Sequence, residues 1–77
     1  GDIVDDRYTV NDKIEFLLTS LQPGQGMTLQ SLFKEATSKV EVIVTFLALL
    51  ELMKMNQFKA KQDNLMGQIE IVRSAAP

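Results

Sequence analysis

The feature that most constrains the fold is a long apolar segment, residues 42–55, with the sequence VIVTFLALLELMKM. On a helical wheel with about 100° per residue and Glu41 at zero, its large apolar side chains fill a continuous arc from roughly 80° to 240°. A helix at the surface of a globular domain needs an apolar stripe only about 100° wide. The segment therefore predicts a helix with more apolar surface than a small core covers, and the surplus indicates a protein partner. The side chains in the arc are Val42, Ile43, Phe46, Leu47, Leu49, Leu50 and Met53.

The opposite side of this helix is expected to face solvent, because it carries Glu41, Thr45, Ala48 and Glu51. Leu52 and Val44 fall among these residues, so even this side is partly apolar. A simple central core helix is the alternative interpretation. Which residues are core and which meet a partner stays open at this point, and the candidate partner-binding residues on this helix are Phe46, Leu49, Leu50, Met53 and Leu52.

Composition excludes several kinds of functional site. The 77 residues allow one small domain. Without cysteine or histidine, the chain forms no disulfide and no thiolate or imidazole metal site, and no cofactor is expected. A serine nucleophile would need a lysine or carboxylate base, and Ser20, Ser31 and Ser38 have simpler surface or capping roles. We therefore predict that the protein is not an enzyme.

The expected setting is the cytoplasm. The absence of cysteine fits a reducing compartment, and nothing at the N-terminus resembles a signal peptide. Glu51 and Lys54 interrupt the apolar segment, which is shorter than the roughly 20 residues of a membrane span. The chain opens at Gly1 rather than methionine, so the parent protein is expected to be longer. We divide it into a flexible acidic lead-in (1–8), one domain (9–72) and a tail (73–77).

Helix-start signals divide the first part of the domain. Thr9 and Asp12 form a capping box, and the helix after it ends at the Pro-Gly turn that follows Gln22. Thr28 caps a short second helix, whose predicted buried set is Leu29, Leu32, Phe33 and Ala36. Ser38 and Glu41 form another capping box at the start of the apolar helix. Two helices in quick succession predict a helix-turn-helix.

After Met55 the spacing of apolar residues along the sequence changes from that of a helix to an alternation of apolar and polar residues. Phe58 and Ala60 alternate with polar residues, a turn follows at 63–67, and Ile69 and Ile71 alternate again. Three helices followed by a β-hairpin predict an α+β fold of the winged-helix type, with a C-terminal hairpin wing. A short extra strand near Met27 and Thr28 is expected to join the hairpin.

Winged helices often bind DNA, but the charge argues against that function here. Nucleic-acid affinity depends mainly on clustered lysine and arginine, whereas this chain carries a formal charge of −2. The one basic cluster is Lys54, Lys59 and Lys61, which fits either a wing that contacts phosphate or an ordinary solvated strand face. A DNA-binding winged-helix transcription regulator stays as an alternative, as does a self-associating module that forms a homodimer.

Two segments resemble a known family. Residues 44–54, TFLALLEL at their centre, and the hairpin ending Met66-Gly67-Gln68-Ile69 resemble the C-terminal winged-helix domain of the bacterial kleisin, segregation and condensation protein A. The resemblance covers about 9–72. The family commonly has an aromatic-Gly-Asp-Ile at the hairpin ending, so this sequence departs from it at the acidic position.

The resemblance implies a non-enzymatic subunit of a chromosome-condensing complex, cytoplasmic and associated with the nucleoid. In the family, this domain docks on the ATPase head of a structural-maintenance-of-chromosomes (SMC) protein. Segregation and condensation protein B would be bound through parts of the full protein that lie outside this chain. No direct nucleic-acid contact and no membrane are expected. The resemblance places Phe46 and Leu50 toward the head, with Leu49 and Met53 beside them.

Phe16 is a further candidate outside the apolar helix. It lies about 100° or more from the stripe of Val10, Ile14, Leu17 and Leu21 on the first helix. We expect its ring to be at least partly exposed, either simply so or as an accessory contact for a partner.

Overall fold

The computed structural model describes residues 9–62 and 67–75. Their elements are α1 (Val10–Ser20), β1 (Gly26–Thr28), α2 (Leu29–Lys34), α3 (Lys39–Lys54), β2 (Phe58–Lys61) and β3 (Glu70–Arg73). This order confirms the α+β class, with three helices and a small antiparallel sheet that are compatible with a winged helix. The predicted lead-in at 1–8, Met66 of the hairpin ending and the end of the tail at 76–77 lie outside the described residues.

Each helix begins at the predicted cap. The side-chain oxygens of Thr9, Thr28 and Ser38 each accept a hydrogen bond, at 3.1 Å, from the backbone N–H three residues further on. Each bond satisfies one of the N–H groups that a helix start leaves without a partner inside the helix. The capping pattern in the sequence therefore located all three helix starts.

The end of α3 explains the change of period that follows it. Asn56 adopts a left-handed conformation with a φ of 61°. The N–H of Asn56 donates to the carbonyl of Met53, and the N–H of Gln57 donates to the carbonyl of Leu52 at 2.8 Å. This pair of bonds is the Schellman motif, which satisfies the last carbonyls of a helix and turns the chain away. The chain then enters β2 directly.

The sheet has the strand order β1-β3-β2, and both pairs are antiparallel. Ile71 of β3 lies opposite Met27 on one side and Ala60 on the other, so the predicted extra strand is confirmed. A Cβ added at Gly26 would lie 3.0 Å from the carbonyl oxygen of Ile71, which explains the glycine at this close approach. Within the described residues, β2 is an edge strand.

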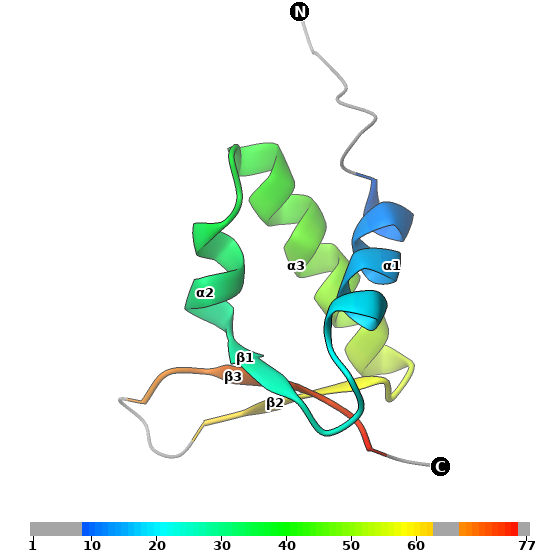
Figure 1. The fold of residues 1–77 in the computed structure, drawn as a ribbon. Coiled ribbons are helices and arrows are strands. Elements are labelled where there is room, and N and C mark those ends of the chain that lie inside the picture. The colour runs from blue at the N-terminus through cyan, green and yellow to red at the C-terminus, as the bar shows by residue number, and fades with distance from the viewer. Residues whose placement is uncertain (1–8, 63–66, 76–77) are drawn as a thin grey trace, which may run out of the picture.

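The helices stand over one side of the sheet, with α3 between α1 and α2 in the view of Figure 1. The core lies where α1, α3 and β2 meet. These elements supply the largest fully buried side chains, which are Leu17, Leu49, Leu52 and Phe58. Arg73 ties the sheet to α1, since its Nη1 donates to the carbonyls of Leu18 and Leu21 at 2.8 and 2.7 Å. Arg73, the first residue of the predicted tail, is instead the last residue of β3 and pairs with Phe58 of β2.

The predicted outward face of α3 is wrong for three of its four residues. Glu41, Thr45 and Ala48 are buried, and only Glu51 is exposed. With Leu52 they form one stripe along the helix, at positions i, i+4, i+7 and i+11. This stripe faces inward because α1 packs against α3 and its Lys13 pairs with Glu41. No helix among the described residues has the length and hydropathy needed to cross a membrane.

Candidate functional site

The outward face of α3 is an apolar ridge. Ile43, Phe46, Leu47 and Leu50 are exposed by 58%, 46%, 46% and 44%, and their spacing of i, i+3, i+4 and i+7 places them on one side of the helix. We call these four residues the α3 strip. Single exposed apolar side chains are normal on a protein surface, whereas contiguous groups of large ones mark interaction sites. The strip is therefore the candidate site.

Phe46 is held in place from one side. Its ring centroid lies 6.5 Å from that of Phe33 of α2, with the planes inclined at 52°. This tilted arrangement is one that aromatic pairs favour. Because Phe33 is half-buried while Phe46 is exposed, the contact limits the motion of an exposed ring. A ring that is already ordered loses less entropy when a partner covers it.

Two hollows flank the strip. The first, which we call the sheet-side pocket, lies between α3 and the sheet and has a volume of about 140 Å³. The second, the α1-side groove, lies between α3 and α1 and has a volume of about 620 Å³. Leu50 lines both, so the strip forms a ridge between two depressions. Such relief gives a partner surface more to match than a flat apolar patch does.

The predicted partner-binding residues fall into three groups. Phe46 and Leu50 belong to the α3 strip. Met53 is half-buried, packs against the core and lines the sheet-side pocket. Leu49 and Leu52 are only 2% and 0% exposed, so they are core residues here and we leave them out of the proposed surface.

Sequence reasoning did not single out Ile43 and Leu47, although they are among the most exposed apolar residues of α3. Both lay inside the same apolar arc as Phe46 and Leu50. Thr45 and Ala48 carry the signal that separates Ile43 and Leu47 from Leu49. Small side chains let a neighbouring helix pack closely, so they mark the buried side of α3, and Ile43 and Leu47 lie away from that side. The prediction that Thr45 and Ala48 face solvent hides this signal.

Phe16 is about half-exposed, as predicted. Its ring lies 5.4 Å from Nζ of Lys13, and both side chains line a hollow of about 210 Å³ between α1 and α2. Leu32 and Glu35 of α2 line the same hollow. This surface is separate from the α3 strip, since no residue of the strip lines it.

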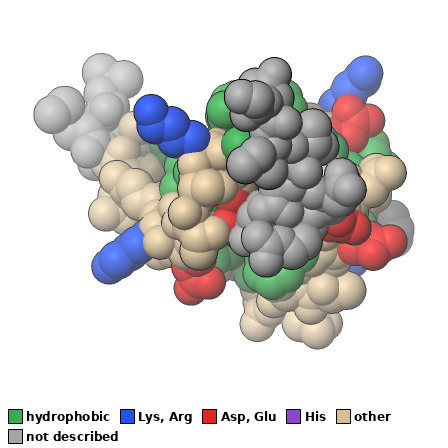
Figure 2. Space-filling model, turned by 90° about the horizontal axis from the view of Figure 1, so that it is seen from above, with side chains coloured by type: hydrophobic (Ala, Val, Ile, Leu, Met, Phe, Trp, Pro, Cys, Tyr) green, Lys and Arg blue, Asp and Glu red, His purple; other side chains and the backbone are tan. Residues whose placement is uncertain are grey.

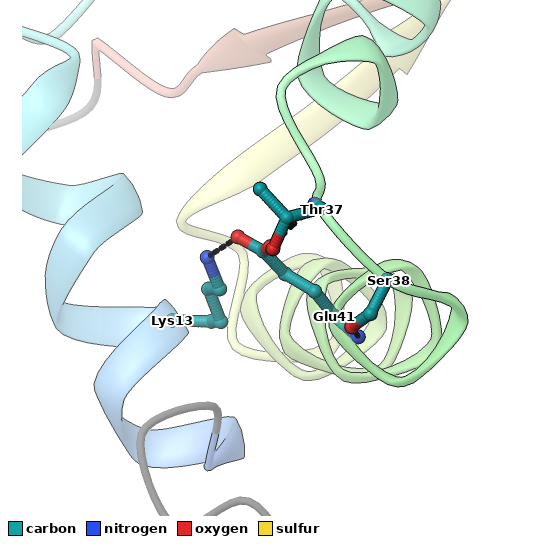
Figure 3. A network of polar contacts seen from close by, with 4 residues as sticks. All are labelled: Lys13, Thr37, Ser38 and Glu41. Carbon is teal, nitrogen blue, oxygen red and sulfur yellow. Dashed lines mark hydrogen bonds and ion pairs between the residues drawn. The ribbon is translucent and has the colours of Figure 1, made fainter.

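A polar network fixes α1 to the start of α3 (Figure 3). Lys13 Nζ lies 2.7 Å from Oε2 of Glu41, while Oε1 accepts from the backbone N–H and the hydroxyl of Thr37 at 2.8 and 3.0 Å. Ser38 accepts from the N–H of Glu41 as predicted, but the Glu41 carboxylate bonds Thr37 and Lys13. The hydrogen bond from Lys13, followed by the Thr37 N–H, lowers the pKa of the Glu41 carboxyl below its ordinary value of 4.5.

The exposed lysines do not form a broad basic surface. Lys59 and Lys61 of β2 and Lys54 of α3 are exposed, and Lys61 lies opposite Glu70 in the sheet. Figure 2 shows the end of the molecule at the top of Figure 1, where separate blue (Lys, Arg) and red (Asp, Glu) side chains lie among tan and green ones. Across the described ranges 9–62 and 67–75, no three acidic side chains gather as metal ligands.

Comparison with known proteins gives a consistent family. Residues 7–74 match the family model described as segregation and condensation protein ScpA. A protein named segregation and condensation protein A from Caldanaerobacter subterraneus subsp. tengcongensis is 40% identical over 70 residues, which cover 91% of this chain and 28% of the relative. Relatives of the same name from Streptococcus suis and Clostridium acetobutylicum are 35% and 34% identical, over 94% and 96% of this chain and 30% of each relative.

The chain therefore spans less than a third of the length of these relatives. No solved structure matches it. The family model nevertheless covers α1 through β3, including the whole α3 strip and both flanking hollows. On that match, together with the relatives that share its name, the chain belongs to the segregation and condensation protein A family.

Proposed function

We propose that this chain is a winged-helix module of a chromosome segregation and condensation complex, and that it docks on the ATPase head of an SMC protein through the α3 strip. The family membership supports the cellular role, since the relatives are named for segregation and condensation. The role is structural and non-enzymatic, and it places the protein in the cytoplasm on the nucleoid. Segregation and condensation protein B would bind through parts of the full protein outside this chain.

The single observation that carries the proposal is the exposure of the four apolar side chains of the strip. Fully burying a leucine, isoleucine or phenylalanine side chain gains roughly 1.5–3 kcal/mol relative to leaving it exposed. Since each strip residue is already about half-buried, a partner that covers it would gain on the order of 1 kcal/mol per residue. Four such residues in one ridge form a compact centre of the kind that dominates interface energetics.

Direct DNA binding is not favoured by the same surface. In a helix-turn-helix protein the exposed face of the second helix reads base edges with side chains such as arginine, asparagine or glutamine. The exposed face of α3 carries Ile43, Phe46, Leu47 and Leu50 instead. Titration with duplex DNA at low salt tests this alternative, because even non-specific binders associate there.

The decisive experiment measures the affinity of the 77-residue chain for the SMC ATPase head of the same organism, by calorimetry and co-purification. Ile43→Asp and Leu47→Asp should each weaken binding at least tenfold, because both place a charge on the strip. Gln22→Asp introduces the same charge in an exposed turn outside the strip and should bind like the parent. Thermal melting should stay within a few degrees for all three variants, since none of these side chains is buried.

Two results would contradict the proposal. One is a parent chain that does not bind the head; the other is Asp variants that bind as tightly as the parent. Self-association is the second candidate function, because the same exposed strip could pair with its own copy. Light scattering over a concentration series separates the two: a dimer that Leu47→Asp disrupts, without any binding to the head, would favour the self-associating module.

A further inference from the structure

We propose that the α1-side groove orients the partner, and that the part of the SMC head covering it carries a basic side chain opposite Glu51 and an acidic side chain opposite Lys54. This inference rests on the proposed docking function and adds to it the charges that the partner surface must carry. The groove shares Leu47 and Leu50 with the α3 strip. A partner that covers the strip therefore also reaches this side of α3.

The groove has apolar walls from two helices. Val10 and Ile14 of α1 line one wall and are half-buried, while Leu47 and Leu50 of α3 line the other and are exposed. The volume of the groove is about 620 Å³. An engineered apolar cavity of about 150 Å³ binds one benzene ring. The groove therefore has room for more than one apolar side chain of the partner.

Charged side chains of both signs line the same groove. Glu51 and Lys54 of α3 belong to its lining, as does Asn11 of α1, and all three are exposed. Among the residues that the structure describes, neither the Glu51 carboxylate nor the Lys54 ammonium takes part in a hydrogen bond or an ion pair. The two residues are three positions apart, so they follow one another along one side of the helix, about 4.5 Å apart along its axis.

Docking would change the surroundings of these two charges. Both are now hydrated, and a partner over the groove would remove part of that water. A charge that is covered without a counter-charge is costly, so a purely apolar partner surface is disfavoured. A base opposite Glu51 and an acid opposite Lys54 would pair both charges, whereas the reverse order would place like charges together. The groove therefore favours one direction of the partner along α3.

The decisive variant exchanges the two charges. Glu51→Lys combined with Lys54→Glu keeps the net charge and the apolar lining of the groove but reverses the order of the charges along α3. It should bind the SMC head at least tenfold more weakly than the parent at low salt, because like charges then face one another, and the loss should shrink at high salt. Calorimetry measures the affinity. If the exchanged variant binds like the parent, the proposal is wrong.

The matched control exchanges two charges elsewhere. Glu35→Lys combined with Lys59→Glu also keeps the net charge, and both residues are exposed and lie outside the groove lining. This control should bind within twofold of the parent, and an equal loss in both exchanges would overturn the proposal. Circular dichroism checks the fold. If the groove exchange does not fold, Glu51→Gln combined with Lys54→Gln replaces it and should weaken binding a few-fold at low salt. Parent-like affinity of that variant would contradict the proposal.

Asn11 tests whether the partner enters the groove. This residue is exposed on α1 and lines the wall opposite α3, so a tryptophan there would fill part of the space. Asn11→Trp should weaken binding to the head at least fivefold. Gln22→Trp, in an exposed turn outside the groove, should bind like the parent. If Asn11→Trp also binds like the parent, the head does not occupy the groove and the proposal is wrong.

A strip variant separates this failure from that of the docking function. Ile43 belongs to the α3 strip but does not line the α1-side groove. If Ile43→Asp abolishes binding while the exchange at Glu51 and Lys54 does not weaken it, the docking function stands and only the orienting role of the groove fails. If the parent chain does not bind the head, both proposals fail. If a second copy of the chain binds where the head does not, the occupant we propose is wrong.

Discussion

The two faces of α3 reverse the usual pattern of an amphipathic helix, in which the more apolar face is the buried one. The buried side carries Glu41, Thr45 and Ala48 with two large apolar residues, Leu49 and Leu52, whereas the exposed strip consists entirely of large apolar residues. If hydrophobicity alone set the rotation of the helix, these faces would be exchanged. The comparison shows that hydrophobicity does not orient a helix that is apolar nearly all round. The size of its side chains and specific polar contacts such as that of Glu41 with Lys13 matter instead.

Each feature of the buried stripe has a physical reason. Ala48 and Thr45 are small, so α1 can approach α3 closely on this side. Glu41 would be costly to bury without partners, but Lys13 and Thr37 supply three hydrogen bonds to its carboxylate. Among the residues that the structure describes, nothing covers the exposed strip to a comparable extent, and its four side chains stay exposed.

The largest effect should come from a matched pair, Leu52→Ala and Leu50→Ala. The two leucines are two residues apart on α3, one fully buried and the other exposed. Leu52→Ala should lower the free energy of unfolding by about 2–5 kcal/mol, because it leaves a cavity in the core. Leu50→Ala should lower it by only about 1 kcal/mol, because this side chain is about half-buried, and should weaken head binding instead. Urea denaturation measures both, and equal losses of stability would remove the distinction between the faces.

An intermediate effect is expected at Ala48, which is fully buried in the stripe. Ala48→Leu makes this face more apolar, yet it should destabilise the fold by about 1–3 kcal/mol, since a fully buried alanine leaves no room for three more carbons. The exposed control is Glu51→Leu, which should change stability by about 0.5 kcal/mol or less. A stabilising Ala48→Leu, measured by thermal melting, would mean that apolar character rather than size orients the helix.

Phe16 tests whether α1 adds an accessory contact. Phe16→Ala should weaken association with the head by about 1 kcal/mol while changing the free energy of unfolding little, because the ring is about half-exposed. Calorimetric titration with the head gives the first quantity and denaturation the second. A large loss of stability would place Phe16 in the core, and unchanged binding would leave the α3 strip as the sole contact.

The smallest effect should appear only at acid pH. The pKa of the Glu41 carboxyl is lower in the folded chain than its ordinary value of 4.5. At pH values between the folded and the unfolded pKa, the unfolded chain therefore binds more protons than the folded chain. The pair with Lys13 should therefore stabilise the fold fully above about pH 5, and this stability should be lost as the pH falls through the folded pKa. Denaturation midpoints between pH 7 and pH 3 should fall less steeply for Glu41→Gln than for the parent. Identical slopes would show that Glu41 does not contribute to acid sensitivity.

Much of the fold was predictable from local residue patterns. Thr9, Thr28 and Ser38 mark helix starts because each cap satisfies a backbone N–H a few residues away, which needs no distant contact. The alternation of Phe58 and Ala60 predicted a strand for the same reason, since side chains in a strand point to opposite faces. The exposure of Phe16 followed from its distance from a clear apolar stripe.

By itself, then, the sequence determined the helices, the hairpin partners, the family resemblance and the surplus of apolar residues on α3. The tertiary structure alone decided which face of α3 became the core, because apolar side chains surround the helix and its period carries too little contrast to fix the rotation. The pair of Lys13 and Glu41 belongs to that packing, since the two residues are 28 positions apart along the chain and meet only when α1 packs on α3. The same packing left Ile43, Phe46, Leu47 and Leu50 exposed and so created the candidate site.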